Sequence, residues 1–324
     1  MIFWLSYILV VILAELIYFN LARHYNIIDR PNERSSHHTP IIRGGGIIFI
    51  IGVWFWFFNT DQLLSFFVAG ATLVALISLA DDIKPRPAWI RFIIHFIAIL
   101  LLFYQVQLYN WHWSLILLAG IVCIGTLNAF NFMDGINGIT GIYAMVNLIT
   151  FLILDKQVFD FTDSSLIIVI LIANSVFLFF NFRKQARCFA GDVGSVTLAF
   201  TQIFFLLQII LATDSLLWVL LFFVFGIDSV ITIIYRLKKK ENIFKAHRTH
   251  LYQFLANELQ WDHRLVALLY GLIQLFFNLL LIYFLTRGLF LMPLFGAVII
   301  SVLYITVREI VIRKIKVTPT SESN

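Results

Sequence analysis

The chain has 324 residues, of which 61% are hydrophobic and only 13% are charged. Its mean hydropathy of +0.92 lies far outside the range of soluble globular proteins, so a soluble domain is excluded and a membrane protein is predicted. The sequence pI near 9.2 is explained by basic loops that contact anionic lipid headgroups, and nucleic acid is not needed as a partner.

Apolar stretches long enough to cross a bilayer, about 20 residues each, recur along the whole chain. They lie roughly at 2–22, 41–58, 62–80, 90–108, 111–127, 138–154, 164–181, 193–212, 215–235, 265–285 and 289–307. We therefore expect an all-α, polytopic integral membrane protein with about eleven transmembrane helices, organised as a single domain over residues 1–324.

The basic residues predict the orientation of these helices. Of the 23 Lys and Arg residues, 21 fall in the connections that follow the odd-numbered stretches, and only Lys156 and Arg287 fall on the other side. Because loops rich in Lys and Arg stay in the cytoplasm, we expect the N-terminus outside and the C-terminus inside.

The outward connections are short, whereas the inward loops are longer and carry nearly every unusual polar residue. These loops cover residues 29–46, 81–91, 128–137, 183–195 and 238–253. We expect them to form one site on the cytoplasmic face.

Four aspartates lie at the inner ends of predicted helices. Asp81 and Asp82 end the third stretch, Asp134 follows the fifth, and Asp192 opens the eighth. Any one of them alone is equally well explained as a helix cap or a solvated loop acid. Adjacent carboxylates, however, repel each other unless a cation or a shared proton relieves them, and ligands that offer only oxygen suit Mg²⁺ or Mn²⁺.

The stretch NAFNFMDGINGITG, residues 128–141, contains three asparagines, an aspartate and no basic residue. Asn128, Asn131 and Asp134 are three residues apart, so in a helical turn they would share one face, where they could coordinate a metal or bind a sugar. The alternative is that these polar groups only satisfy a broken helix.

Two glycine-rich stretches suggest phosphate recognition. AGDVGS, with Gly191, lies at the start of a predicted helix, where free N–H groups and the helix dipole favour phosphate. RGGG, residues 43–46, would likewise offer exposed backbone amides to phosphate oxygens, together with the guanidinium of Arg43. With the carboxylates, they predict a metal-assisted site for a diphosphate.

The longest inner loop contains His247, Arg248 and His250. Attraction to the membrane surface explains the neighbouring lysines at 238–240 but explains HRTHLYQ poorly. Asp228 lies inside a predicted span, close enough to its inner end to reach the site, and ionisable residues there are costly and usually functional.

With these motifs, the chain resembles the polyprenyl-phosphate N-acetylhexosamine-1-phosphate transferases, of glycosyl transferase family 4 type, over nearly its whole length. DDIKPRPAWIR is similar to the Asp-Asp loop of that family, NAFNFMDGINGI to its Asn-x-x-Asn-x-x-Asp-Gly-x-Asn-Gly motif, and GDVGS to its Gly-Asp-x-Gly motif. RPNERSSHHTPIIRGGG and HRTHLYQ most resemble the branch that initiates O-antigen synthesis. The family's His-x-His-His pattern is incomplete, because only His250 carries over.

The resemblance implies an enzyme of the bacterial inner membrane that transfers an N-acetylhexosamine 1-phosphate from a UDP-sugar to undecaprenyl phosphate and releases UMP. It implies Mg²⁺, or Mn²⁺, as the cofactor, with Asp192 and Asn131 as ligands. Asp81 would ionise or orient the lipid phosphate, and Asp82 would support the metal or the other loops. Asp134 completes the catalytic set. The remaining residues implied in substrate binding are Arg43, Arg91, Asn128, Asn137, Gly191, His247, Arg248 and His250.

Two alternatives differ in their expected patterns. A transporter would place polar residues near mid-span, with paired discontinuous helices and internal symmetry. A CDP-alcohol phosphatidyltransferase would carry an arginine after its Asp-Gly pair, and DGINGI has none. Direct attack by the lipid phosphate is favoured over a covalent aspartyl intermediate, although the sequence leaves both open.

Overall fold

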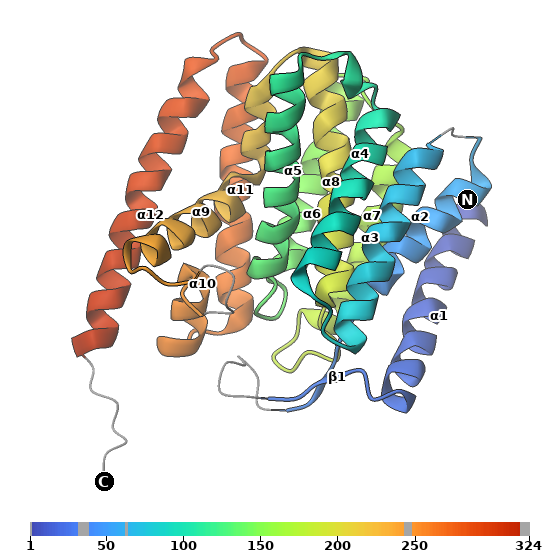
Figure 1. Ribbon diagram of the computed structural model, residues 1–324, viewed down its shortest axis with the longest axis horizontal. Coiled ribbons are helices and arrows are strands. Elements are labelled where there is room, and N and C mark those ends of the chain that lie inside the picture. Colours follow the sequence, from blue (N-terminus) through green and yellow to red (C-terminus); the bar gives the residue numbers. More distant parts are fainter. Residues whose placement is uncertain (1, 32–38, 62–63, 243–247, 318–324) are drawn as a thin grey trace.

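The computed structural model describes residues 2–31, 39–61, 64–242 and 248–317, and nearly all regular structure in these ranges is helical (Figure 1). The long helices are α1 (Ile2–His24), α2 (Ile47–Asn59), α3 (Ser65–Ile83), α4 (Ala88–Gln105), α5 (Trp113–Met133), α6 (Ile139–Gln157), α7 (Ser164–Asn181), α8 (Gly191–Thr213), α9 (Phe223–Lys238), α11 (His263–Leu285) and α12 (Leu291–Val317). The short elements are β1 (Ile28–Asp29), β2 (Ile41–Ile42), η1 (Leu108–Asn110), η2 (Leu216–Phe222), α10 (Leu251–Gln253) and η3 (Phe254–Glu258). The predicted all-α polytopic class is confirmed.

Ten helical segments in the described ranges are long and apolar enough to cross a bilayer, and they match ten of the eleven predicted stretches. Helix α2 is the exception, because the stretch predicted at 41–58 is helical only over Ile47–Asn59. Thirteen residues span about 20 Å, well short of a hydrocarbon core about 30 Å thick. The missing part, residues 41–46, forms β2 and a glycine turn that packs against the segment leading into α8.

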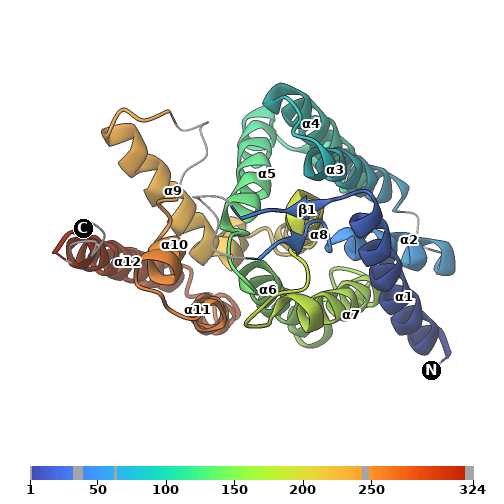
Figure 2. The same cartoon turned by 90° about the horizontal axis from the view of Figure 1, so that it is seen from below.

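Helix α8 lies at the centre of the bundle, where it packs against α2, α3, α5 and α6 (Figure 2). Its side chains are buried almost continuously from Gly191 to Ile210. A helix that is apolar on all sides needs such surroundings, because no face of it suits water. The position of its first turn is therefore fixed by the whole bundle.

The long loops gather at one end of the molecule, the lower end in Figure 1. The ends of α3, α5 and α7 and the starts of α4, α6 and α8 meet there, together with β1, β2 and α10. The prediction that these loops share one face is confirmed, whereas the side of the membrane they face stays a prediction.

A neutral polar network crosses the interior between α6, α11 and the junction of η2 with α9. The Gln274 Oε1 atom accepts hydrogen bonds from the Tyr143 hydroxyl at 2.8 Å and from the Val224 backbone N–H at 2.9 Å. The Gln274 Nε2 atom donates to Asn278 Oδ1 at 2.6 Å. The change from η2 to α9 interrupts the helix, and Gln274 accepts the Val224 N–H at this point. A side chain is needed for this, because the membrane interior offers no water as a hydrogen-bond partner.

Candidate active site

The glycine turn at 43–46 is joined directly to the segment that leads into α8. The backbone N–H groups of Gly45 and Gly46 donate to the carbonyl oxygens of Phe189 and Ala190, at 2.8 and 3.1 Å. A Cβ atom on Gly46 would overlap the backbone of Gly194, so neither segment tolerates a side chain at that contact. Glycine is required here for close packing of two backbones.

The N–H groups of the first turn of α8 are also occupied. Asp82, whose side chain is fully buried, accepts the N–H of Asp192 on Oδ1 and the N–H of Val193 on Oδ2, both at 3.0 Å. The prediction that free amides of the two glycine-rich stretches bind phosphate is therefore wrong for these groups. Asp82 caps α8 from a neighbouring helix and takes the place that an anion would have occupied.

Two arginines bridge the carboxylates. Arg43 donates from Nε to Asp82 Oδ1 at 2.6 Å and from Nη2 to Asp192 Oδ1 at 3.0 Å. Arg91 donates from Nη1 to Asp81 Oδ2 at 2.9 Å and to Asp192 Oδ2 at 3.2 Å. The repulsion expected between these acids is thus relieved by two guanidinium groups, and the predicted members Asp81, Asp82, Asp192, Arg43 and Arg91 form one cluster.

Access differs within this cluster. The side chains of Asp81 and Asp192 are 11% and 15% exposed, and those of Arg43 and Arg91 are about one-third exposed. Burial disfavours the charge of Arg43, but Asp82 and Asp192 outweigh it and raise the pKa of Arg43 above its usual value. The reachable part of the cluster therefore consists of two carboxylates and two permanent cations.

The motif at 128–138 reaches this cluster through the turn that follows α5. Asp134 lies just beyond the helix, with φ −82° and ψ 64°, so it does not share a helical face with Asn128 and Asn131 as predicted. Burial, together with the carboxylates of Asp192 and Asp82, raises the pKa of Asp134 to about 7. Asn128 is exposed, and its amide donates to the Ile124 carbonyl of its own helix at 2.8 Å.

Asn137 ties the same turn to the loop after α7. Its side chain is 4% exposed, and Nδ2 donates to the Arg183 carbonyl at 2.9 Å, whereas its Oδ1 has no hydrogen-bond partner. The next residue, Gly138, has a positive φ of 87°, which glycine adopts without strain. Its N–H donates to Asn181 Oδ1 at 2.7 Å, so two asparagines position this turn.

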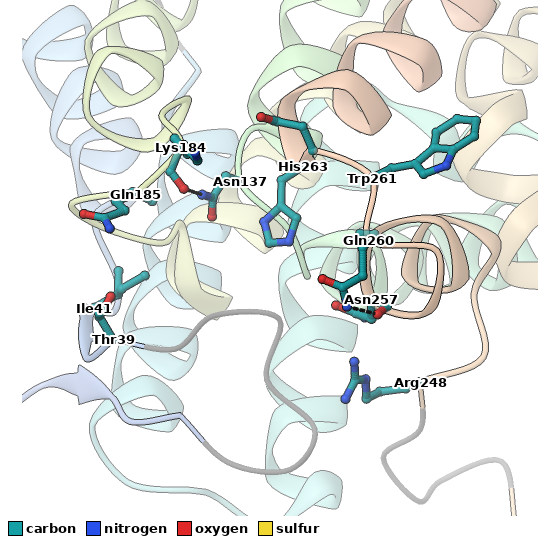
Figure 3. Close-up of a pocket in the computed structure, with 13 residues that line it drawn as sticks. Thr39, Ile41, Asn137, Lys184, Gln185, Arg248, Asn257, Gln260, Trp261 and His263 are labelled. Carbon is teal, nitrogen blue, oxygen red and sulfur yellow. Dashed lines mark hydrogen bonds between the residues drawn. The ribbon is translucent and has the colours of Figure 1, made fainter. Parts of the chain in front are cut away.

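Asn137 also lines a cavity of about 500 Å³ at the same end of the molecule (Figure 3). The wall opposite comes from the segment after η3, where Trp261 and His263 lie (Figure 3). The cationic side chains Lys184 and Arg248 also line it. The cavity thus combines an aromatic ring, amides and positive charge, which suits a polar, anionic ligand with a flat group.

The remaining predicted residues fall outside this cavity or outside the described chain. His247 lies outside the described residues. His250 is only 2% exposed, and its Nδ1 lies 2.8 Å from Asp228 Oδ1, so it faces the interior of the protein. Gly191 has a φ of 69°, and a Cβ there would meet Asp82 and the backbone of Gly44, so this glycine serves the packing of the cluster.

The donor set can be tested against the expected Mg²⁺. Among the described residues, no group of three or more His, Cys, Asp and Glu side chains is close enough to hold a metal ion alone. Mg²⁺, however, is commonly bound through one or two carboxylates, with water and substrate phosphate completing its shell. The partly exposed Asp192 and Asn131 offer oxygen donors of the required kind, so these residues fit the ion.

Residues such as Trp261 and Lys184 were not predicted from the sequence. They lie in segments without a motif, and a single exposed aromatic or basic residue carries no signal of its own. The clue that was available is the position of Lys184 and Arg248 in two of the five inward loops.

The comparisons with known proteins agree with this geometry. The model of glycosyl transferase family 4 matches residues 64–211, which include all four aspartates of the site. A probable undecaprenyl-phosphate N-acetylglucosaminyl 1-phosphate transferase of Bacillus subtilis is 24% identical over 84% of this chain and 81% of its own length. An undecaprenyl-phosphate alpha-N-acetylglucosaminyl 1-phosphate transferase of Yersinia pestis is 27% identical over 71% of this chain and 69% of its own length.

A phospho-N-acetylmuramoyl-pentapeptide-transferase of Dictyoglomus turgidum is 31% identical over 59% of this chain and 68% of its own length. The match in sequence, the bundle of spanning helices and the cluster of arginines and aspartates at one end of it lead to one conclusion. The chain belongs to glycosyl transferase family 4, as a membrane-embedded polyprenyl-phosphate sugar-1-phosphate transferase.

Proposed function

We propose that this transferase moves an N-acetylhexosamine 1-phosphate from a UDP-sugar to undecaprenyl phosphate, releases UMP, and so initiates a lipid-linked surface glycan such as O-antigen. The observation that carries the proposal is the cluster in which Arg43 and Arg91 bridge Asp81, Asp82 and Asp192, at the same end of the molecule as a cavity with cationic and aromatic lining residues. The named relatives support the acceptor and the sugar class.

In this reaction an oxygen of the lipid phosphate attacks the phosphorus that carries the sugar, and the bond from that phosphorus to the bridging oxygen of the donor diphosphate breaks. A new diphosphate forms, and UMP leaves with the electrons of the broken bond. Arg43 and Arg91 are placed to contact phosphate oxygens, since the side chain of each is about one-third exposed. Asp81 orients the acceptor phosphate through Arg91, which it shares with Asp192.

Mg²⁺, held by Asp192 and Asn131, would offset the negative charge of the two substrates and polarise the diphosphate. Asp192 keeps its carboxylate directed by Arg43 and Arg91, so it is preorganised for such a role. We favour direct attack by the lipid phosphate, because both reachable aspartates are already engaged by arginine, which makes them poorer nucleophiles.

The donor fits the cavity. Lys184 and Arg248 supply positive charge for the diphosphate, and the imidazole of His263, which points into the cavity (Figure 3), supplies a flat face for the base or the sugar ring. The unpaired Oδ1 of the buried Asn137 can accept an N–H from the donor. The transporter alternative is not supported, because the chain belongs to a transferase family and its charged motifs gather at one end.

The decisive experiment uses purified protein, undecaprenyl phosphate and a panel of UDP-N-acetylhexosamines. Formation of the lipid-linked sugar together with UMP is expected with at least one donor, and EDTA should abolish it until Mg²⁺ or Mn²⁺ is restored. Asp163→Asn, at the opposite end where Asp163 caps α7, is the control and should transfer normally. Absence of product with every donor would contradict the proposal.

We further propose a bacterial inner-membrane location, with the N-terminus outside and the C-terminus and active site in the cytoplasm. The support is the division of the basic residues together with the gathering of the inward loops at one end. A cysteine at Lys239 should react only from the cytoplasm, and one at Asp163 only from outside. Labelling of Lys239→Cys from outside in intact cells would overturn the orientation.

A further inference from the structure

Asp228 is a carboxylate inside a membrane span that the proposed chemistry does not use. Its side chain is fully buried in α9. Oδ1 lies 2.8 Å from His250 Nδ1, and Oδ2 accepts the hydroxyl of Tyr270, on α11, at 2.6 Å. A weaker hydrogen bond comes from Thr232 at 3.3 Å. A buried acid is costly in this setting, so its retention with a histidine needs an explanation.

The carboxylate dictates the state of the imidazole. An ionised carboxylate can only accept hydrogen bonds, so Nδ1 of His250 must carry a proton. His250 also begins α10, where its backbone N–H donates to Gln253 Oε1 at 3.3 Å and its carbonyl oxygen accepts the Gln253 N–H at 3.1 Å. The ring of His250 is thereby held by Asp228, and its backbone is held by Gln253 of the same helix.

The segment that His250 anchors contacts the turn that carries Asp134 and also lines the cavity proposed for the donor. Tyr252, two residues on, donates its hydroxyl to the Phe132 carbonyl at 2.9 Å. A Cβ on Gly135 would overlap that same hydroxyl, so Tyr252 packs tightly under the turn that carries Asp134. Two residues before His250, Arg248 lines the cavity proposed for the donor.

We propose that Asp228 is a positioning residue for the transfer reaction. Through His250 it fixes the segment 248–253, and so sets the place of Arg248 in the donor cavity and of Tyr252 beneath the 132–135 turn. This inference rests on the proposed function, because it assigns to the cavity the UDP-sugar of that reaction. Asp228 would thus affect the reaction without contacting the substrate.

A purely structural role of Asp228 would have a different effect on the kinetic constants. Loss of a contact that only stabilises the fold lowers the amount of folded enzyme, and therefore the rate per total protein, but leaves both KM values unchanged. Loss of a positioning contact displaces donor-binding groups in protein that remains folded, so the KM for the donor must rise.

The test variant is Asp228→Asn, which keeps the shape and can still bond His250 and Tyr270 but removes the charge. We expect the donor KM to rise about tenfold or more and the acceptor KM to change by less than about twofold. Tyr143→Phe, which removes one hydroxyl from the neutral network elsewhere in the membrane, is the matched control and should leave both KM values unchanged. Should Asp228→Asn not fold, Tyr270→Phe should raise the donor KM in the same direction by a smaller factor.

The role through His250 is tested by combining variants. His250→Ala with Asp228→Asn should be no worse than the more damaged single variant, because both remove the same support. Independent effects of the two changes, or an unchanged donor KM in Asp228→Asn, would overturn the inference.

A spectroscopic readout separates this inference from the proposed function. In protein with ¹⁵N-labelled histidine, the His250 signals, identified by their loss in His250→Ala, should show a protonated Nδ1 that depends on Asp228. If the wild-type enzyme transfers no sugar phosphate from any UDP-sugar, the proposed function fails while this pairing is still confirmed. If Nδ1 proves unprotonated, the pairing fails whatever the enzyme transfers.

Discussion

Two of the polar assemblies in the described chain satisfy buried groups with different chemistry. At the end of the bundle where the long loops gather, Asp82 and Asp192 are joined by Arg43, and ionic groups with partial exposure hold the glycine turn, α3 and α8 together. In the interior, Gln274 and Tyr143 satisfy the break between η2 and α9 with neutral groups that are fully buried. In this pair, charge lies where water and substrate phosphate can approach and amides lie where neither can, whereas the buried Asp228 beside His250 is an ionisable exception.

The comparison implies that changes in the ionic cluster act mainly on catalysis, whereas changes in the neutral network act mainly on stability. The largest effect is expected for Asp192→Asn. It removes the charge that Arg43 and Arg91 share and the proposed oxygen ligand of Mg²⁺, so transfer should fall by about 100-fold or more. Steady-state turnover at saturating Mg²⁺ measures this, and near-normal turnover with normal folding would remove Asp192 from the metal site.

A smaller loss is expected when the geometry of one arginine changes and its charge is kept. Arg43 uses two different nitrogens, Nε for Asp82 and Nη2 for Asp192, and one ammonium group cannot reproduce this fork. Arg43→Lys should therefore lower kcat/KM by about 10- to 100-fold. Arg91 uses a single nitrogen for both partners, so Arg91→Lys is the matched comparison and should lose less. Equal losses would show that charge alone matters at both positions.

The two asparagines of α5 should differ from each other. Asn131 is the proposed metal ligand, so Asn131→Ala should cost about tenfold in transfer and raise the Mg²⁺ concentration needed for half-maximal rate. Asn128 is exposed and bonded to its own helix, so Asn128→Ala should change the rate by less than about twofold. Mg²⁺ titrations of both variants test this difference. A larger loss in Asn128→Ala than in Asn131→Ala would show that Asn131 is not the metal ligand.

The smallest effect on the reaction is expected in the neutral network. Gln274→Leu leaves the Tyr143 hydroxyl and the Val224 N–H without their acceptor, at a cost of about 1–3 kcal/mol in stability. Thermal denaturation in detergent should show a lower midpoint, and both KM values should match those of the wild type. A raised KM would mean that this network, too, reaches the active site.

The sequence was sufficient to predict the class, the spans and most members of the cluster. Hydropathy identifies spanning helices reliably, and acids at helix ends stand out against an apolar background. It could not predict that Asp82 would take up the amides of α8, because the partner of an N–H depends on how α3 and α8 pack. The length of α2 was misjudged for a similar reason, since apolar residues 41–42 fit a strand as well as a span.

The cavity was beyond sequence reasoning. Asn137 belongs to a recognisable motif, but Trp261 belongs to none, and only tertiary packing brings them to opposite walls of one cavity. The contact of His250 with Asp228 in the protein interior was also not predicted, because the two residues lie in separate segments, 22 residues apart in the sequence.

The contact between Gly46 and Gly194 has a consequence for biogenesis. These residues are packed backbone to backbone, yet 147 residues lie between them in the chain. During synthesis, Arg43 emerges and reaches the membrane surface long before Asp192 has been translated, and it must wait there without its partners. The catalytic centre is thus completed only when the eighth helix is threaded into a bundle whose earlier members are already inserted, and a nascent chain halted before that point holds no active intermediate.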